Sequence, residues 1–229
     1  MKSAWVCIGT ALLLAGCVHH KRARIPPPPP PGAPGAPTGP AAIRPGQTET
    51  GLASWYGYPY HGRAAANGEI YDMEKMTAAH RTLPFDTWVR VYNLDNNKTT
   101  EVRITDRGPF VDGRIIDLSH AAAGEIDMIG PGTARVRIEI IRVPAGAASG
   151  LFGIQVGAFR DRANAERLRV RMEAEYGSAR LVQRPGDPVL WRVLVGAEPS
   201  QDAAATLAER IRKDSVEKTA GFIVRIDAN

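Results

Sequence analysis

The sequence contains almost no cysteine. Of its 229 residues only Cys7 and Cys17 are cysteines, so residues 18–229 contain no thiol that could form a disulfide or bind a metal. The histidines show no His-x-His or His-Glu-x-x-His spacing. There is also no P-loop, no Gly-x-Gly-x-x-Gly after an expected strand and no Gly-x-Ser-x-Gly. These absences predict a protein without a metal or cofactor.

Excess positive charge is missing from most of the chain. The first 47 residues hold five Lys/Arg and no Asp/Glu, whereas residues 48–144 hold 11 against 13 and residues 145–229 hold 13 against 11. A nucleic-acid-binding protein needs a basic patch on a folded domain. The net charge of +5 therefore predicts no nucleic-acid partner, although the cations near Cys17 suit anionic lipid headgroups.

The chain has no apolar run long enough to cross a bilayer as a helix. Residues 4–14, behind Lys2, have the length of the apolar core of a secretory signal. The following Leu-Ala-Gly-Cys17 resembles the lipobox of bacterial lipoproteins, which predicts residues 1–16 as a signal peptide and Cys17 as the lipidated residue. Val18 after the cysteine, in place of Asp, resembles outer-membrane lipoproteins that face the periplasm. An ordinary signal peptide with a chance cysteine is the alternative.

Residues 17–47 are predicted to form a disordered tether. Residues 26–31 are all proline, and Gly, Ala and Pro dominate from there to residue 45. Such sequence favours extended polyproline II at about 3.1 Å per residue. About thirty residues of it reach on the order of 90 Å, which suits a membrane-anchored protein whose target lies some distance away.

The next segment, residues 48–143, is predicted to be mostly β. Runs of β-branched residues with partial alternation predict strands at residues 48–56, 87–93, 99–105 and 133–143. Short helices are expected around residues 74–80 and after Ser119, a good N-cap, through Gly124. Several short strands at close spacing predict a small barrel.

A linker at residues 144–150 leads to a second domain at residues 151–229, which has a βαββαβ pattern. Strands are expected at residues 152–159, 179–183, 190–195 and 222–227, and helices at residues 161–176 and 200–213. This order matches a ferredoxin-like arrangement.

Glycine-rich polar blocks interrupt the strands of the first domain. They lie at residues 53–57, 61–63, 66–72, 76–85, 105–110 and 113–119. Taken together, these blocks resemble the rare lipoprotein A family of septal lytic transglycosylases, and the resemblance covers residues 50–141. It implies a double-psi β-barrel that cleaves peptidoglycan glycan strands and leaves a 1,6-anhydromuramic product.

The resemblance also implies the catalytic residues. Cleavage needs a proton for the leaving glycosidic oxygen, and our hypothesis is that Asp106 or Glu69 donates it. Asp72 and His80 would tune the pKa of that donor or position it. Each has a structural alternative: a turn carboxylate for Asp106, a helix cap for Asp72 and a structural histidine for His80.

Three blocks of the second domain, at residues 153–159, 164–168 and 191–196, resemble the SPOR domain. That family binds glycan strands stripped of stem peptides at the division septum. Alternation places Ile154, Val156 and Ala158 toward the helices, and Gln155 and Phe159 on the open face of the sheet. The candidate glycan-binding residues are Gln155, Phe159, Trp191 and Arg192, with a core position as the alternative for the two aromatics.

The sequence therefore predicts a mainly β plus α+β protein: a double-psi β-barrel followed by a ferredoxin-like SPOR domain, after a disordered tether. Its predicted function is that of a lytic transglycosylase targeted to the septum, without cofactor or metal. Its partners would be denuded glycan strands and the membrane, with divisome proteins as further candidates. A non-catalytic glycan-binding or wall-tethering lipoprotein is the alternative.

Overall fold

A computed structural model describes residues 43–147, 150–184, 188–214 and 221–226 of the chain. The predicted signal peptide, the lipidation site Cys17 and most of the proline-rich segment lie outside the described residues. None of the described helices is long and apolar enough to span a membrane. The two folded domains are described in turn.

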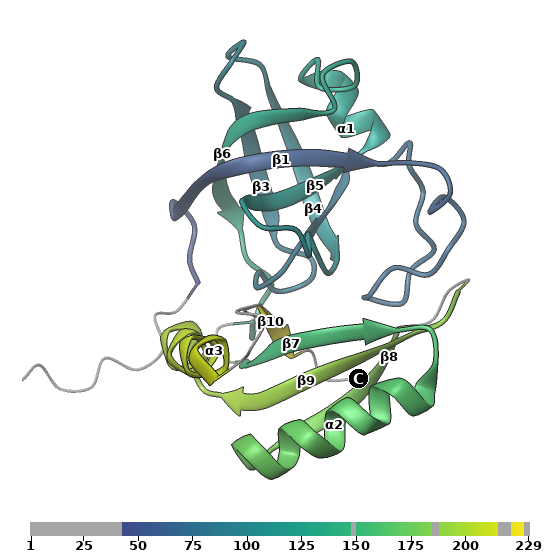
Figure 1. Ribbon diagram of the computed structural model, residues 1–229. Coiled ribbons are helices and arrows are strands. Elements are labelled where there is room, and N and C mark those ends of the chain that lie inside the picture. Colours follow the sequence, from purple (N-terminus) through teal and green to yellow (C-terminus); the bar gives the residue numbers. More distant parts are fainter. Residues whose placement is uncertain (1–42, 148–149, 185–187, 215–220, 227–229) are drawn as a thin grey trace, which may run out of the picture. The chain divides into compact units, whose positions relative to one another are not determined.

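The first domain is a closed barrel of six strands (Figure 1). Around the barrel the strands follow the order β1-β5-β2-β4-β3-β6. Their bounds are β1 Thr48–Tyr56, β2 Thr77–His80, β3 Trp88–Asn93, β4 Thr99–Asp106, β5 Arg114–Ser119 and β6 Thr133–Arg142. The closed barrel confirms the small barrel predicted from the sequence.

Alternating apolar residues of these strands fill the barrel. Inward positions on β3, β4 and β6 hold Val, Ile and Ala, while the positions between them hold Arg, Glu, Tyr and Thr. This is the pattern expected of strands that bury one face and expose the other. The largest fully buried side chains of the barrel are Val89, Val91, Val102, Ile104, Ile116, Leu118, Ile126, Met128, Val136 and Ile138.

The expected helix at residues 74–80 is wrong, because Thr77–His80 forms strand β2. All four of its residues are buried, so that both faces of this strand are covered. A short strand buried on both faces shows no alternation, and its two alanines favour a helix by propensity alone. Strand β5 was not predicted for the same reason. Its neighbouring residues Ile115 and Ile116 are both buried, so its sequence shows no alternation of apolar and polar residues.

Helix α1, His120–Glu125, follows β5 as expected. Ser119 is its N-cap, and its Oγ accepts a hydrogen bond from Ala122 N at 3.2 Å. Ala122 and Ala123 are fully buried against the strands. A side-chain oxygen that satisfies a free amide of the first turn stabilises a helix by about 1 kcal/mol, which explains why so short a helix begins here.

The second domain is a four-stranded antiparallel sheet with two helices. Its elements are β7 Leu151–Phe159, α2 Arg162–Tyr176, β8 Ala179–Arg184, β9 Leu190–Glu198, α3 Gln201–Asp214 and β10 Phe222–Ile226. The strand order β10-β7-β9-β8 is that of a ferredoxin-like βαββαβ fold, as predicted. The predicted turn at residues 185–187 and the predicted last strand residue, Asp227, lie outside the described residues.

The helices of this domain carry recognisable caps and a narrow apolar side. Asp161 accepts from Asn164 N at 2.7 Å at the start of α2, and Gly177 ends the helix in a left-handed conformation at φ 81°. The core beneath the helices consists of Phe152, Ile154, Ala179, Val195, Ala204, Ala208 and Ile211, with Met172, Tyr176 and Leu207 packed against it. Both helices therefore turn part of their apolar side chains to this core, α2 through Met172 and Tyr176 and α3 through Ala204, Ala208 and Ile211.

A β-bulge in β7 changes which side chains face the helices. The register with β9 shifts between Gln155 and Gly157, so that Val156 has no direct partner. An added Cβ on Gly157 would lie 2.9 Å from the side chain of Leu168 on α2. Beyond the bulge, Gly157 therefore faces the helices and Ala158, which is exposed, faces away, the reverse of the predicted alternation.

Candidate active site

Asp106 is the last residue of β4 and is held by main-chain donors. Its Oδ1 accepts hydrogen bonds from Ala66 N at 3.0 Å and from its own neighbour Arg107 N at 2.7 Å. Ala66 lies in the long loop between β1 and β2, and Asn67 N of the same loop donates to Thr105 O at 3.2 Å. Two donors from separate segments fix the orientation of this carboxyl group.

Two stacked tyrosines lie close to Asp106. Tyr56 ends β1, and its ring stacks on that of Tyr71 at 4.3 Å between centroids and 18° between planes. The Tyr71 hydroxyl donates to Tyr56 O at 2.6 Å. Burial, followed by the negative charge of Asp106, raises the pKa of Tyr56 well above its usual range. Tyr56 is therefore a neutral hydrogen-bond donor, and among the described residues its hydroxyl has no partner.

The loop that carries these groups also exposes aromatic side chains. Tyr58 is 77% exposed and Tyr60 is 45% exposed. The ring of Tyr60 makes an edge contact with Tyr56 at 6.2 Å, and the guanidinium of Arg63 lies 5.9 Å from the Tyr60 ring. Exposed rings beside a carboxyl group resemble the surfaces on which sugars stack.

Glu69 is engaged in an ion pair instead. Its two carboxylate oxygens bind Arg103 Nη1 at 2.9 Å and Nη2 at 2.7 Å, and Arg103 Nη1 also binds Asp86 at 2.6 Å. The hydrogen bond from Arg103 lowers the pKa of Glu69. A carboxylate that is ionised and paired in this way is a poor proton donor near neutral pH. Within the described part of the chain, no hydrogen bond or ion pair joins Glu69 to Asp106.

Asp72 lies at a turn rather than at a helix start. Its Oδ1 accepts from Glu74 N at 3.0 Å, and it lies 3.7 Å from Nδ1 of His61. The predicted helix that it was expected to cap is absent, because residues 73–76 form a turn before β2. Asp72 therefore stabilises the loop that carries Glu69 and Tyr71.

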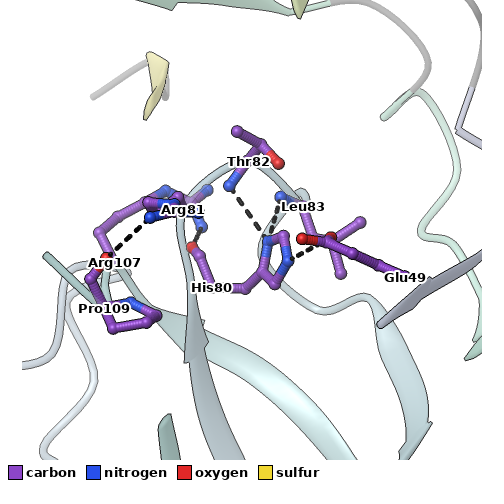
Figure 2. Close-up of polar contacts among 7 residues, drawn as sticks. All are labelled: Glu49, His80, Arg81, Thr82, Leu83, Arg107 and Pro109. Carbon is purple, nitrogen blue, oxygen red and sulfur yellow. Dashed lines mark hydrogen bonds and ion pairs between the residues drawn. The ribbon is translucent and has the colours of Figure 1, made fainter. Parts of the chain in front are cut away.

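His80 is buried at the end of β2, and Figure 2 shows its contacts. Its Nδ1 accepts from Thr82 N at 3.2 Å and Leu83 N at 3.1 Å, and its Nε2 lies 3.2 Å from Glu49 Oε2. Its main-chain oxygen accepts from Arg107 Nη1 at 3.0 Å. The structure therefore connects His80 to the Asp106 turn through its backbone, while its ring points to Glu49.

A half-buried carboxylate, Asp117, lies on β5 two residues before the helix N-cap Ser119, a place that favours a structural interpretation. Ser54 Oγ donates to its Oδ1 at 2.6 Å and Arg114 Nη2 donates to its Oδ2 at 3.1 Å. Burial raises the pKa of Asp117 against the effect of these hydrogen bonds. Both oxygens are used by neighbours, which fits the structural interpretation.

The predicted glycan-binding residues of the second domain separate onto two faces. Residues directly opposite each other in an antiparallel pair share a face. Arg192 pairs with Ala158 and Gln155 pairs with Leu194, which places Gln155 and Arg192 on the face away from the helices. Trp191 pairs with Phe159, and both lie on the helix side.

The predicted open-face position of Phe159 is therefore wrong, and the bulge is the reason. An added Cβ on Gly157 would lie 2.7 Å from the Phe159 ring, beside Leu168 of α2. The Trp191 ring lies 5.0 Å from the guanidinium of Arg162, the first residue of α2. The two aromatics pack near the helix, the core alternative left open by the sequence.

Tyr56 and Glu49 are the two residues that the sequence did not assign to the site. Tyr56 belongs to one of the glycine-rich blocks, but nothing in the sequence pattern indicates a hydroxyl without a hydrogen-bond partner. Glu49 is an ordinary strand residue, and only the structure brings it to His80. Among the described residues, no group of three or more His, Cys, Asp or Glu is placed to bind a metal ion.

Comparison with known proteins identifies both domains. The family model described as Lytic transglycolase, a double-psi β-barrel family, matches residues 48–138, and the SPOR domain model matches residues 148–225. The endolytic peptidoglycan transglycosylase RlpA of Vibrio cholerae is 62% identical over 98 residues, which cover 43% of this chain and 37% of that relative. This chain thus spans well under half of that protein.

Other relatives match this chain over about three quarters of its length. The endolytic peptidoglycan transglycosylase RlpA of Helicobacter pylori is 36% identical over 206 residues, or 77% of this chain and 65% of that relative. The protein of the same name from Campylobacter jejuni is 37% identical over 194 residues, or 74% of this chain and 70% of that relative. An identity of this level over most of both chains shows that this chain belongs to the RlpA family.

Proposed function

We propose that the chain is an endolytic transglycosylase that cleaves peptidoglycan glycan strands, with Asp106 as the carboxyl group that acts on the glycosidic bond. The names of its relatives and the match of its barrel to the lytic transglycolase family support the reaction. The observation that carries the assignment is the fixed orientation of Asp106 beside Tyr56, whose hydroxyl lacks a partner among the described residues.

One carboxyl group suffices for this reaction. The acid gives its proton to the glycosidic oxygen as the bond between that oxygen and the anomeric carbon breaks. The C6 hydroxyl of the same muramic acid then attacks the anomeric carbon, and its proton returns to the carboxylate. The product is a 1,6-anhydro sugar, and no water is consumed. A lone Asp106 can therefore serve as acid and then as base.

Asp106 is a better candidate than Glu69 because two main-chain donors fix its orientation. Glu69 is half exposed and is bound on both oxygens by Arg103, which lowers its pKa. Asp106 is buried: its Oδ1 accepts from two main-chain donors, its Oδ2 lies 3.0 Å from Arg184 Nη2, and a neutral tyrosine lies nearby. Glu69 and Asp72 then serve to hold the loop of residues 57–76, and His80 to hold the turn after Asp106.

The exposed aromatics of that loop provide a surface for the glycan strand. Tyr58 and Tyr60 are exposed, and the Arg63 guanidinium lies over the Tyr60 ring. Sugar rings stack on such aromatic rings, while an arginine suits the lactyl carboxylate of muramic acid. An extended aromatic surface fits a polymer that is cut within its length.

The second domain is proposed to bind denuded glycan strands and to direct the enzyme to the septum. The match to the SPOR domain supports this role. Gln155 and Arg192, which share the face away from the helices, are the proposed contacts. Removal of the stem peptide leaves the lactyl carboxylate free, and an arginine binds a carboxylate more strongly than an uncharged amide.

The N-terminal segment is proposed to anchor the protein in the outer membrane. The support is the lipobox-like Leu-Ala-Gly-Cys17 and the Val18 that follows it. Two or more acyl chains on Cys17 would make that anchor stable. The proline-rich residues behind it would let the folded domains reach the wall.

Product release from sacculi tests the reaction. We expect the purified chain to release anhydromuramic products, more so after amidase treatment, and Asp106→Asn to lower kcat by on the order of 10²–10⁴. Asp112→Asn, an exposed aspartate six residues further along, is the matched control and should leave kcat unchanged. Full activity in both Asp106→Ala and Glu69→Ala would refute the assignment. No release by the wild-type chain would favour the alternative, a non-catalytic glycan-binding protein.

A further inference from the structure

The ring of His80 has both nitrogens occupied within the barrel (Figure 2). Nδ1 accepts from two main-chain N–H groups, of Thr82 and Leu83, so it carries no proton. The ring proton therefore resides on Nε2 and is donated to Glu49 Oε2 at 3.2 Å. This contact pattern fixes one tautomer of a ring that is only 3% exposed.

Glu49 is the partner that holds this tautomer from another part of the barrel. It lies on β1, which pairs with β5 and β6, whereas His80 ends β2, which pairs with β4 and β5. Its side chain is 46% exposed, while that of His80 is 4% exposed. The hydrogen bond therefore links two strands that are not neighbours in the sheet.

The end of β2 in turn holds the turn that begins with Asp106. Ala79 is in register with Asp106 in the parallel β2–β4 pair. Arg107 Nη1 donates to His80 O at 3.0 Å, and Arg81 Nη1 approaches Pro109 O at 3.5 Å. These two contacts, visible in Figure 2, hold the turn at Arg107 and at Pro109, directly after the residue that carries the carboxyl group.

The Arg107 side chain is further fixed by stacking. Its guanidinium lies 3.7 Å from the centroid of the Phe85 ring, in the segment that follows Thr82 and Leu83. The same residue donates its main-chain N–H to Asp106 Oδ1. Displacement of residues 80–85 would therefore move His80 O and the Phe85 ring, which both hold the Arg107 side chain. It would thereby also move Arg107 N, one of the two main-chain donors to Asp106.

We propose that Glu49 is a positioning residue for the reaction: through His80 it fixes the end of β2, and thereby the orientation of the Asp106 carboxyl group. The effect on catalysis rests on the proposed role of Asp106. His80 then has a structural role: its ring supports the end of β2 and exchanges no proton with the sugar. Glu49 belongs to none of the glycine-rich blocks, so no pattern in the sequence indicated it.

Substitutions at Glu49 separate positioning from charge. Glu49→Ala removes the acceptor for Nε2–H, and we expect kcat to fall between about tenfold and a hundredfold, with KM nearly unchanged, as for a small displacement of a catalytic group. Glu49→Gln keeps an oxygen that can accept from Nε2, so its kcat should stay within about twofold of the wild type. A general loss of folding would instead lower the melting temperature of both Glu49→Ala and Glu49→Gln, and their kcat values would not differ in this way.

Glu101→Ala is the matched control. The Glu101 side chain is also 46% exposed and also pairs with a barrel side chain, Arg90 at 2.7 Å, but on the outer surface away from the turn. Its kcat should equal that of the wild type. Wild-type kcat in Glu49→Ala, or an equal loss in Glu101→Ala, would overturn the proposal.

Nuclear magnetic resonance of the ¹⁵N-labelled full chain gives a readout that does not need activity. The amide signals of Ala66 and Arg107, the two donors to Asp106, should shift in Glu49→Ala and remain in place in Glu49→Gln and Glu101→Ala. Unmoved signals in Glu49→Ala would refute the coupling. If the wild-type chain releases no anhydro product but these signals shift, the coupling stands and the proposed reaction falls.

Discussion

Asp106 and Glu69 are both anchored to β4, yet their partners set them apart. Asp106 is oriented by main-chain donors and lies beside a neutral tyrosine, whereas Glu69 faces the guanidinium of Arg103. Sequence reasoning placed both in the site but did not rank them. The ranking depends on Arg103, which lies 34 positions from Glu69 and belongs to no block that the sequence singled out.

The first residue-scale prediction concerns Glu69→Gln. Because the ion pair is half exposed, its loss should lower the free energy of unfolding by less than about 1 kcal/mol. Its kcat should fall at least tenfold less than that of Asp106→Asn, since the proton donor is retained. Steady-state rates of product release and urea unfolding measure the two effects. A loss of kcat as large as that of Asp106→Asn would make Glu69 the proton donor.

The second residue-scale prediction is a pH dependence of stability. Burial acts to raise the pKa of Glu49, but the hydrogen bond from His80 and the positive charge of Arg81 outweigh it and lower the pKa below 4.5. A carboxylate with a lowered pKa in the folded state stabilises the protein above its unfolded pKa and loses that effect as pH falls through its folded pKa.

Denaturant unfolding of the wild type and Glu49→Gln should therefore differ most at pH 7. The difference should be constant down to about pH 4.5 and shrink below it, because glutamine does not titrate. A difference that stays constant to pH 3 would mean that the Glu49 carboxylate has the same pKa in the folded and unfolded states.

At the scale of elements, the strands that alternate were predicted well and two of those that do not were missed. β3, β6 and most of β4 alternate buried and exposed positions, which gives a period of two in the sequence. β1 does not alternate in this way, but its threonines and aromatic residues favour a strand. β2 and β5 bury residues on both faces. Their sequences therefore carry no period, and β2 looked like a helix.

The bulge in β7 is the other element that the sequence could not reveal. A single extra residue, Val156, reverses every later side chain of the strand, so the face prediction was right for Gln155 and wrong for Ala158 and Phe159. Glycine at position 157 is a necessary part of this arrangement, because a Cβ there would meet the Phe159 ring at 2.7 Å and Leu168 at 2.9 Å.

Gly157→Ala should therefore lower the free energy of unfolding by about 1–3 kcal/mol through overpacking. Ala158→Ser, at the exposed neighbour on the opposite face, should change it by less than about 0.5 kcal/mol. Thermal and chemical denaturation of the full chain report both values. Equal stability of the two variants would indicate that Phe159 and Leu168 leave room for a methyl group.

At the scale of the whole molecule, the two domains carry chemically different sites. The barrel holds the buried Asp106 carboxyl group beside two tyrosines, while the second sheet holds the buried Gln155 and the half-buried Arg192 on one face. The family resemblance predicted both domains and their order, because many short blocks occur in the expected sequence. The resemblance did not predict the contacts of each site residue, because these contacts join residues up to 78 positions apart in the sequence.

Binding and cleavage should therefore separate by mutation. Arg192→Ala should weaken binding of the full chain to amidase-treated sacculi by about tenfold, the effect of losing one hydrogen bond to a charged group, while release from soluble glycan strands persists. Arg171→Ala, on the exposed side of α2, is the matched control. Co-sedimentation measures the binding, and unchanged binding of Arg192→Ala would remove this residue from the glycan contact.

The closed ring of the barrel also governs how copies of the protein can meet. Each of its six strands has a hydrogen-bonded neighbour on both sides, so the barrel offers no unpaired main-chain ladder to another molecule. The second sheet ends in β10 and β8, whose outer edges pair with no other described strand. Where many copies crowd onto one surface, strand addition is thus confined to these two edges of the second domain.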